Sequence, residues 1–358
     1  MAKAPKETGT KLSLTERILK TSGSKYASIL STSELMLDRD IVDVGVIGIN
    51  IAMSGEVDKG FTSSITQWAG PSKHFKTLFA LIQVAAYLRK YPESICVLYD
   101  SEFGSPLSYF SSVGIDPSRV IHIPVLTLEE LRTEMVNNLK DVERGERVIF
   151  MVDSIGNLAS RKETEDAEAG SDKADMTRAK TAKSLFRLVT PHFALKDIPL
   201  VVINHTYQTL EMFSKTVVGG GTGSVYGADN IFILGRQQDR PQGSDLLGYD
   251  FIINVEKSRY AREKSKIPIY VSFEKGLDKY SGMVDLGIAF GFIKSPAKGQ
   301  FFKYDPDTGE VFEDKKFKAS QLEADRSFME KMVNSSTFKA KVIEHFKLPV
   351  ANLLHEEV

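Results

Sequence analysis

Short apolar runs alternate with longer stretches of helical periodicity through the middle of the chain. The short runs are rich in β-branched residues and end in polar side chains, as buried strands do. We expect strands over residues 62–69, 95–99, 120–125, 148–152, 199–203, 231–234, 250–255 and 268–273. Between two of them, residues 127–145 place leucines at helical spacing behind the capping-box pair Thr127 and Glu130. This alternation predicts an α/β fold.

The strand runs are apolar throughout, which favours a mostly parallel central sheet covered on both faces by helices. In such sheets, ligands bind at the carboxyl ends of the strands. The last strands, after the glycine-rich stretch 219–223, follow one another closely and are expected to be antiparallel or hairpin-like.

Helical patterns also occupy both ends of the chain. Leu14, Ile18 and Leu19 mark a short N-terminal helix that is too small to fold alone, so it is expected to dock on the core or on another subunit. Helical patterns over 283–290, 320–332 and 335–346 predict a small α-rich C-terminal region. We therefore expect a docking segment over 1–35, a core over 36–282 and a C-terminal region over 283–358.

Composition narrows the classes of partner. The 358 residues carry 46 Lys and Arg against 47 Asp and Glu, a formal charge of −1, so a polyanion would have to bind to a local patch. With 42% hydrophobic residues, the chain is an ordinary globular protein, and no apolar run is long enough to span a membrane. Cys96 lies in an apolar run and is interpreted as core, and the polar N-terminus lacks a secretory signal. These features predict a cytoplasmic protein without a membrane partner.

A phosphate-binding loop is predicted where the first strand meets a helix. The pattern GxxxxGK[ST] is matched except that Phe75 replaces its second glycine, over Gly70, Pro71, Ser72, Lys73, His74, Phe75, Lys76 and Thr77. Lys76 would carry positive charge to the β- and γ-phosphates of ATP, and Thr77 would place a hydroxyl on Mg²⁺. A left-handed backbone at residue 75 would strain a phenylalanine, and a chance turn is the alternative.

Two carboxylates follow neighbouring strand runs. Asp153 ends the run 148–152, where phosphate-loop ATPases place the acid that orients the metal. Glu102 follows the run 95–99 and could deprotonate an attacking water. Any buried strand can end in an acid, but three such elements at successive strand ends coincide much less often by chance.

The segments GPSKHFKT, LYDSEFG, FMVDSIGNLAS, INHTYQT, MFSKTVVGGGTG and NVEKSR occur in this order. Over residues 10–290 the chain resembles the RecA/Rad51 recombinase superfamily, and specifically the UvsX recombinases of T-even-like phages, in which phenylalanine at the second glycine position is itself a group mark. The resemblance implies a RecA-like core with an N-terminal polymerisation segment.

The same resemblance implies roles for individual residues. Lys76, Thr77, Glu102 and Asp153 fall on the ATP and metal residues. Tyr109 falls on an aromatic residue that stacks on adenine. From the sequence alone, an aromatic side chain half-buried on a helix explains Tyr109 equally well. His205 falls on the sensor that links the γ-phosphate to a DNA loop, with a strand-end histidine as the alternative. Lys257 and Arg259 fall on cations that reach the nucleotide of the next subunit, with an exposed strand-end pair as the alternative.

Two segments are expected to contact DNA. The second DNA loop of the family falls on 206–223, whose large apolar side chains suit stacking between bases and whose glycines allow close approach to phosphates. The residues that we expect to contact DNA there are Tyr207, Met212, Phe213, Lys215, Gly220 and Gly221. The first falls on 160–174, which is acidic and would repel phosphate. The helix after it carries four cations to which we assign backbone contacts, Arg178, Lys180, Lys183 and Arg187, with a solvated helix face as the alternative.

The resemblance implies an ATP-dependent, DNA-dependent ATPase with Mg²⁺ as cofactor. Such a recombinase forms a filament on single-stranded DNA and exchanges strands with a homologous duplex, in recombination, repair and replication. It also implies a recombination mediator and a single-strand-binding protein as partners, in the cytoplasm of a phage host. A hexameric helicase-type ATPase of the same core and a scaffold that binds nucleotide without hydrolysing it are the alternatives.

Overall fold

The computed structural model describes residues 12–36, 39–170, 177–209, 215–219, 221–239, 248–297, 299–305, 307–311, 313 and 315–349. The chain divides into two compact units, residues 1–40 and 41–358. In the first unit, α1 (Leu14–Thr21) begins at a capping box in which Ser13 and Glu16 each accept the other's backbone N–H. Leu14 and Ile18 are 64% and 60% exposed, so this helix has no core of its own.

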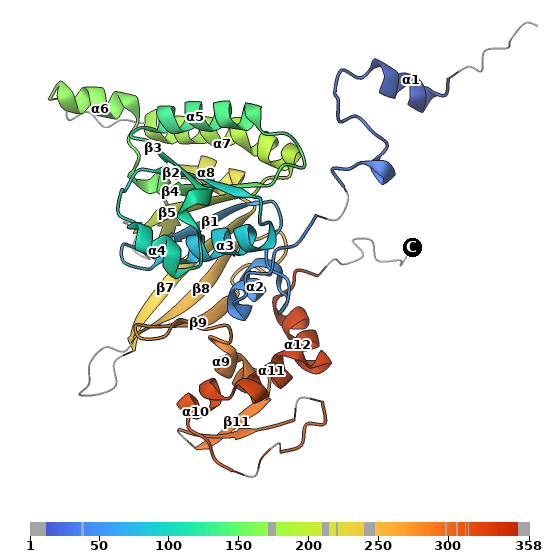
Figure 1. Cartoon of the computed structure of the whole chain (residues 1–358), viewed down its shortest axis with the longest axis vertical. Helices are drawn as coiled ribbons and strands as arrows, with labels where there is room; N and C mark the ends of the chain where they lie inside the picture. The colour runs from blue at the N-terminus through green and yellow to red at the C-terminus, as the bar shows by residue number, and fades with distance from the viewer. Residues whose placement is uncertain are drawn as a thin grey trace, which may run out of the picture. The chain divides into compact units, whose positions relative to one another are not determined.

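A mixed sheet organises the second unit (Figure 1). Its strands run in the order β10-β9-β8-β7-β1-β5-β4-β2-β3, and β6 pairs with β5. Strands from β7 to β3 in this order are parallel, whereas β8 and β9 are antiparallel to their neighbours. The strand bounds are β1 Ile65–Gly70, β2 Ile95–Asp100, β3 Val120–Pro124, β4 Val148–Asp153, β5 Leu200–Gln208, β6 Thr216–Val218, β7 Asn230–Asp239, β8 Gly248–Lys257, β9 Lys266–Ser272 and β10 Gly276–Leu277.

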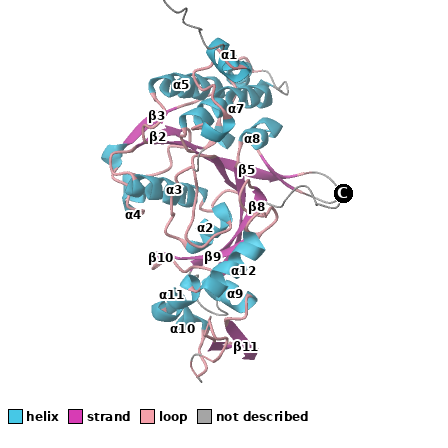
Figure 2. Cartoon of the chain, turned by 90° about the vertical axis from the view of Figure 1, so that its right-hand side faces the viewer, coloured by secondary structure: helices cyan, strands magenta, loops and turns pink. Residues whose placement is uncertain are grey.

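Helices cover both faces of this sheet, as the two views in Figures 1 and 2 show. One buried cluster joins the sheet to α2 (Ile47–Ser54) and α3 (Lys76–Lys90), and α4 (Leu107–Ser112) adds Phe110 to it. The other cluster joins the opposite face to α5 (Leu128–Asp141) and α7 (Thr177–Lys196). The short helices α6 (Arg161–Glu168) and α8 (Gly221–Gly227) flank α7.

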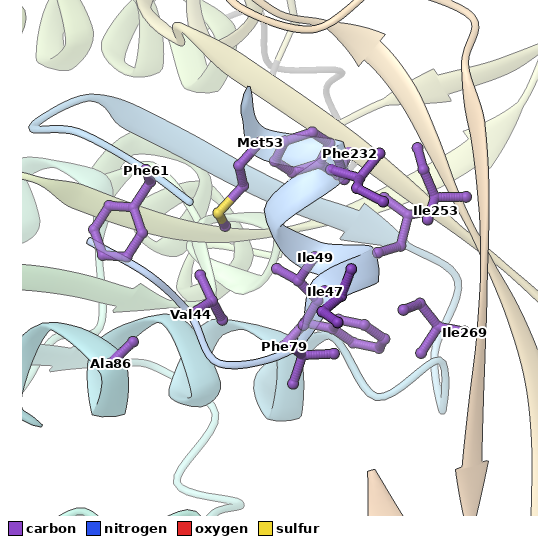
Figure 3. Packing of buried hydrophobic residues seen from close by; sticks show 14 of the residues in the cluster. Val44, Ile47, Ile49, Met53, Phe61, Phe79, Ala86, Phe232, Ile253 and Ile269 are labelled. Carbon is purple, nitrogen blue, oxygen red and sulfur yellow. The ribbon is translucent and has the colours of Figure 1, made fainter. Parts of the chain in front are cut away.

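Figure 3 shows α2 packed between α3 and the antiparallel strands. Ile49 and Phe79 are fully buried there, and Phe232 and Ile253 close the cluster from β7 and β8. Burial of this kind stabilises by roughly 1.5–3 kcal/mol per large apolar side chain. The packing fixes α3, and therefore the loop that precedes it, against the sheet.

The C-terminal part of the second unit combines helices with a hairpin. Its elements are α9 Met283–Ala289, β11 Ile293–Ala297, β12 Gln300–Lys303, α10 Ala319–Ala324, α11 Arg326–Asn334 and α12 Ser336–Phe346. Lys303 is 1% exposed, and its ammonium group contacts Asp325 and lies 3.9 Å from the ring centre of Phe317. A buried ammonium needs such partners, because desolvation of an unpaired charge is very costly.

The predicted fold class is confirmed, as are the antiparallel last strands. Several boundaries were wrong. The helix expected over 127–145 ends at Asp141, and the one expected over 320–332 breaks at Asp325, whose carboxylate caps α11 by accepting from the Phe328 N–H. The strand expected over 199–203 continues to Gln208 because it pairs with β6. The sequence predicted neither α2, which is buried on all sides and lacks a periodic polar face, nor the hairpin of β11 and β12. Among the described residues, no helix is both long and apolar enough to cross a membrane.

Candidate nucleotide and DNA site

Strand pairing brings the predicted site residues to one edge of the sheet. In the parallel register, Gly70 of β1 lies opposite His205 of β5, and Asp100 of β2 lies opposite Asp153 of β4. The carboxyl ends of these four strands therefore meet, which is where ligands bind in parallel sheets. The loop of residues 70–77 leaves this edge and opens α3.

Phe75 adopts the left-handed conformation that the glycine pattern requires, with φ 53° and ψ 28°. Lys73 is left-handed as well, at φ 61°. Each such residue costs an L-amino acid about 1–2 kcal/mol. The Phe75 ring packs 5.5 Å from the ring of Phe251 and edge-on at 5.7 Å to that of Tyr249, so aromatic contacts offset part of this strain.

Lys76 and Thr77 occupy the first turn of α3 and point to the same edge. Lys76 is 8% exposed, and its Nζ donates to the Pro71 carbonyl at 3.0 Å. Burial lowers the pKa of this ammonium group, and the carboxylates of Glu102 and Asp153 oppose that effect. The Thr77 hydroxyl donates to Asp153 Oδ2 at 3.1 Å, so the two predicted metal residues are in direct contact.

Asp153 is 6% exposed, and its Oδ1 has no hydrogen-bond partner among the described residues. Burial, and secondarily the negative charge of Glu102, raises its pKa to about 7. An orphaned buried carboxylate oxygen is costly unless a cation or a donor meets it. No group of three or more His, Cys, Asp or Glu side chains suited to a metal occurs in the described part of the chain. Thr77 and Asp153 together fit Mg²⁺, which binds through one or two protein oxygens plus water and phosphate.

Glu102 is held by two side chains from neighbouring strands. Its Oε1 accepts from the Ser154 hydroxyl at 2.5 Å and lies 3.2 Å from His205 Nε2. The hydrogen bond with His205 is the main reason that the pKa of Glu102 falls to about 2, with Ser154 adding to it and burial opposing it. Glu102 is thus a carboxylate whose position depends on a histidine of β5.

Gly156, which we did not assign to the site from the sequence, and Arg178, which we assigned to DNA, support His205. A β-carbon on Gly156 would lie 2.4 Å from His205 Cδ2, so only glycine lets the segment after Asp153 pack on this ring. Arg178 donates to the carbonyls of Gly156 and Leu158, each at 2.8 Å. The assignment of Arg178 to the DNA backbone was therefore wrong, because its guanidinium group is used inside the chain. No local pattern could have revealed these contacts, which depend on packing.

The second predicted DNA segment begins as a hairpin rooted at His205. β5 continues through Thr206 to Gln208 and pairs with β6, and the Gly219 N–H donates to the His205 carbonyl at 2.8 Å. Asn204, fully buried, donates to the Gly219 carbonyl at 2.9 Å. The two ends of the hairpin are thus tied to the residue that contacts Glu102.

The residues predicted to contact DNA are only partly described. Tyr207 is 55% exposed on the hairpin, and Lys215 is exposed beside it. Met212, Phe213 and Gly220 lie outside the described residues, and Gly221 is the first residue of α8. On α7, Lys180 and Arg187 are both exposed. The side chains that are exposed, and therefore accessible to a ligand, are Tyr207, Lys215, Lys180 and Arg187.

Tyr109 lies on α4, half-buried against the cluster that contains α3. Burial, with a contribution from the charge of Asp153, raises the pKa of its hydroxyl to about 12. The tyrosine is therefore neutral, and it lies close enough to Asp153 to sense its charge.

Lys257 and Arg259 lie away from the phosphate loop of their own chain. Lys257 Nζ donates to the carbonyls of Val225 at 2.9 Å and Ala228 at 2.6 Å, at the end of α8. Arg259 forms an ion pair with Asp229, whose carboxylate also accepts from the Ile65 N–H at the start of β1. Since β1 runs from Ile65 to Gly70, Arg259 is separated from the loop by the length of that strand, roughly 17 Å at about 3.3 Å per residue.

Comparisons with known proteins identify a family model and several relatives that are similar to this chain. Residues 280–342 match the family model described as the C-terminal domain of the bacteriophage T4 recombination and repair protein. Over 334 residues the chain is 48% identical to the "Recombination and repair protein" of Enterobacteria phage T4, covering 93% of this chain and 83% of that protein.

More distant relatives are bacterial. "Protein RecA" of Paenarthrobacter aurescens is 24% identical over 75% of each chain, and that of Thermus aquaticus is 22% identical over 81% of this chain and 84% of its own. A crystal structure of the RadB recombinase aligns with a TM-score of 0.48 at 19% identity, over 66% of this chain and 98% of its own. The chain therefore belongs to the family of the phage T4 recombination and repair protein within the RecA-type recombinases, and it is an ATP-dependent recombinase.

Proposed function

We propose that the edge formed by β1, β2, β4 and β5 binds ATP and Mg²⁺ and that the hairpin of β5 and β6 binds DNA. The observation that carries this proposal is the 3.2 Å contact between Glu102 and His205, because it connects the acid beside the phosphate loop to the root of the hairpin. The backbone of residues 70–75 and the first turn of α3 would hold the phosphates, with Tyr109 beside the base.

In this proposal, Lys76 neutralises charge on the β- and γ-phosphates when it exchanges the Pro71 carbonyl for phosphate oxygens. Mg²⁺, bound through Thr77 and Asp153, would supply further positive charge to the same oxygens. Glu102 orients the attacking water and accepts its proton. Since Glu102 Oε1 already accepts from Ser154 and contacts His205, the carboxylate is freed to act on water when His205 loosens its hold on it.

DNA would provide that change. Bases stacking on Tyr207 would reorient the hairpin, and Gly219 and Asn204 would transmit the movement to the backbone of His205. The side chain of His205 would then exchange Glu102 for the γ-phosphate, which accounts for hydrolysis that depends on DNA. Lys180, Lys215 and Arg187 would bind phosphates of the strand.

Assembly would complete the site. Lys257 and Arg259 cannot reach the loop of their own chain across the length of β1, so we assign them to the nucleotide of the neighbouring subunit in a filament. The N-terminal segment 1–35, with its exposed Leu14 and Ile18, would dock on that neighbour, and 283–358 would form a small C-terminal region. A recombination mediator and a single-strand-binding protein are the proposed partners, in the cytoplasm of a phage host. The relatives do not favour a helicase or a scaffold without hydrolysis.

Replacing Glu102 by Gln is expected to slow ATP hydrolysis by about 10²-fold or more, because the loss of a general base typically has an effect of this size. Binding of ATP and of single-stranded DNA should persist, because the amide preserves size and can still contact Ser154. Lys76→Ala should instead weaken ATP binding itself. Phosphate release and nucleotide titration measure both effects, with Glu134→Gln, at an exposed position of α5, as the control. Hydrolysis within a few-fold of the unchanged chain would remove Glu102 from catalysis.

Replacing Tyr207 by Ala is expected to weaken binding of single-stranded DNA by about 1–3 kcal/mol through lost stacking, with an unchanged salt dependence. Lys215→Ala should lower the slope of log affinity against log salt by about 0.7, since one phosphate contact is lost. Fluorescence anisotropy over a salt series checks both, and Tyr226→Ala, which removes a tyrosine that is 76% exposed on α8, is the matched control. Equal affinities for the Tyr207 and Tyr226 variants would contradict the assignment.

Mixing two inactive proteins tests the shared site. Lys76→Ala subunits can still offer Lys257 to a neighbour, and Lys257→Ala subunits retain an intact phosphate loop. DNA-stimulated hydrolysis should therefore reappear when the two variants assemble on one strand, to about a quarter of the unchanged activity, because in a random filament only one interface in four combines the two intact halves. Absence of recovery, with co-assembly shown by energy transfer between labelled subunits, would place Lys257 outside the site.

A further inference from the structure

The phosphate loop contains two left-handed residues that are not glycine, and a side chain from a distant strand bonds to it. Arg236 of β7 donates from Nη1 to the carbonyl of Lys73 at 2.5 Å. Lys73 and Phe75 are the two residues of this loop with positive φ, at 61° and 53°. The guanidinium group thus binds the loop at the first of its strained positions.

The same arginine is itself positioned by the aromatic ring that contacts Phe75. Its guanidinium carbon lies 4.4 Å from the centre of the Tyr249 ring, within the range of a cation–π contact. The Tyr249 ring meets Phe75 edge-on at 5.7 Å, and Phe251 contacts both rings. One connected group, Arg236, Tyr249, Phe251 and Phe75, therefore joins the antiparallel strands β7 and β8 to both strained positions of the loop.

We propose that Arg236 and Tyr249 are positioning residues that hold the phosphate loop in its nucleotide-binding conformation where Phe75 replaces a glycine. A glycine adopts φ near +55° without steric cost, whereas phenylalanine returns to negative φ unless its surroundings prevent it. Arg236 fixes the Lys73 carbonyl, and Tyr249 confines the Phe75 ring. The inference rests on the proposed ATP site, since it concerns the same loop, and it adds two residues from β7 and β8 to the requirements of that site.

A double-mutant cycle with Phe75→Gly tests whether Arg236 and Tyr249 act by holding Phe75 in its left-handed conformation. Glycine adopts this conformation without strain, so the support from the two residues should no longer be needed at position 75. The probe is a fluorescent N-methylanthraniloyl derivative of ATP, titrated into the full-length chain without DNA. Arg236→Ala is expected to raise its Kd about tenfold, or ~1.4 kcal/mol, in the Phe75 chain and by less than about threefold in the Phe75→Gly chain. Tyr249→Leu should behave like Arg236→Ala, and Tyr249→Phe should bind as the unchanged chain does, since it keeps the ring face.

Arg147→Ala is the matched control. It removes an arginine that lies 4.5 Å from the ring centre of Tyr91, an equivalent pair outside the loop, and it should leave the Kd unchanged. Equal weakening by Arg236→Ala in both backgrounds would mean that the arginine acts independently of Phe75, through Lys73 or on the nucleotide itself, and no weakening in either would mean that Arg236 does not hold the loop. Both results overturn the inference while the ATP site stands.

Failure of the unchanged chain to bind the probe, or indifference of binding to Lys76→Ala, would instead reject the ATP site itself. Melting temperatures without nucleotide establish that each variant is folded. If Arg236→Ala does not fold, Arg236→Lys supplies the test, since it keeps the charge but loses the planar stacking on Tyr249, and it should raise the Kd in the Phe75 chain more than in the Phe75→Gly chain.

Discussion

The parallel register of the central strands determines which side chains can act together. With Gly70 opposite His205 and Asp100 opposite Asp153, a shift by one residue in either pair would turn the relevant side chains to the other face. The register is held by apolar packing on both faces of the sheet, through the clusters around α2 and α3 and around α5 and α7. Site geometry is therefore a consequence of core packing.

Two features of the site are costly in free energy, the left-handed backbone of Phe75 and the buried carboxyl group of Asp153. Phenylalanine in the phosphate loop does take the glycine conformation, and it does so inside an aromatic cluster. The buried Asp153, whose pKa of about 7 is unusual for a carboxyl group, contacts the threonine that the phosphate-loop pattern assigns to Mg²⁺. Both are unfavourable alone, and the nucleotide and cation that we propose for this edge would offset their cost.

Local patterns were sufficient to predict the alternation of strands and helices in the core and the position of the loop after β1. Phe75 follows a strand and Lys76 begins the next helix, and the acids at the ends of β2 and β4 could be found from their apolar runs. What could not be predicted depends on contacts between distant residues. The extension of β5 to Gln208 requires β6 as a partner, the inward-facing Arg178 requires the backbone after Asp153, and Arg236 meets Lys73 across 163 residues. Side-chain charge suggested a DNA contact for Arg178, because a sequence cannot distinguish an exposed guanidinium from one that binds backbone carbonyls.

We propose that His205 couples the nucleotide edge to the DNA hairpin. Hydrogen–deuterium exchange of the filament on single-stranded DNA, compared between ATP in the Glu102→Gln protein and ADP, measures this coupling at backbone resolution. Coupling through His205 predicts that protection changes at residues 204–209 and 215–219 together with residues 70–77, and that His205→Ala restricts the change to 70–77. Identical protection of the hairpin in both nucleotide states, with a clear change in the phosphate loop, would contradict it.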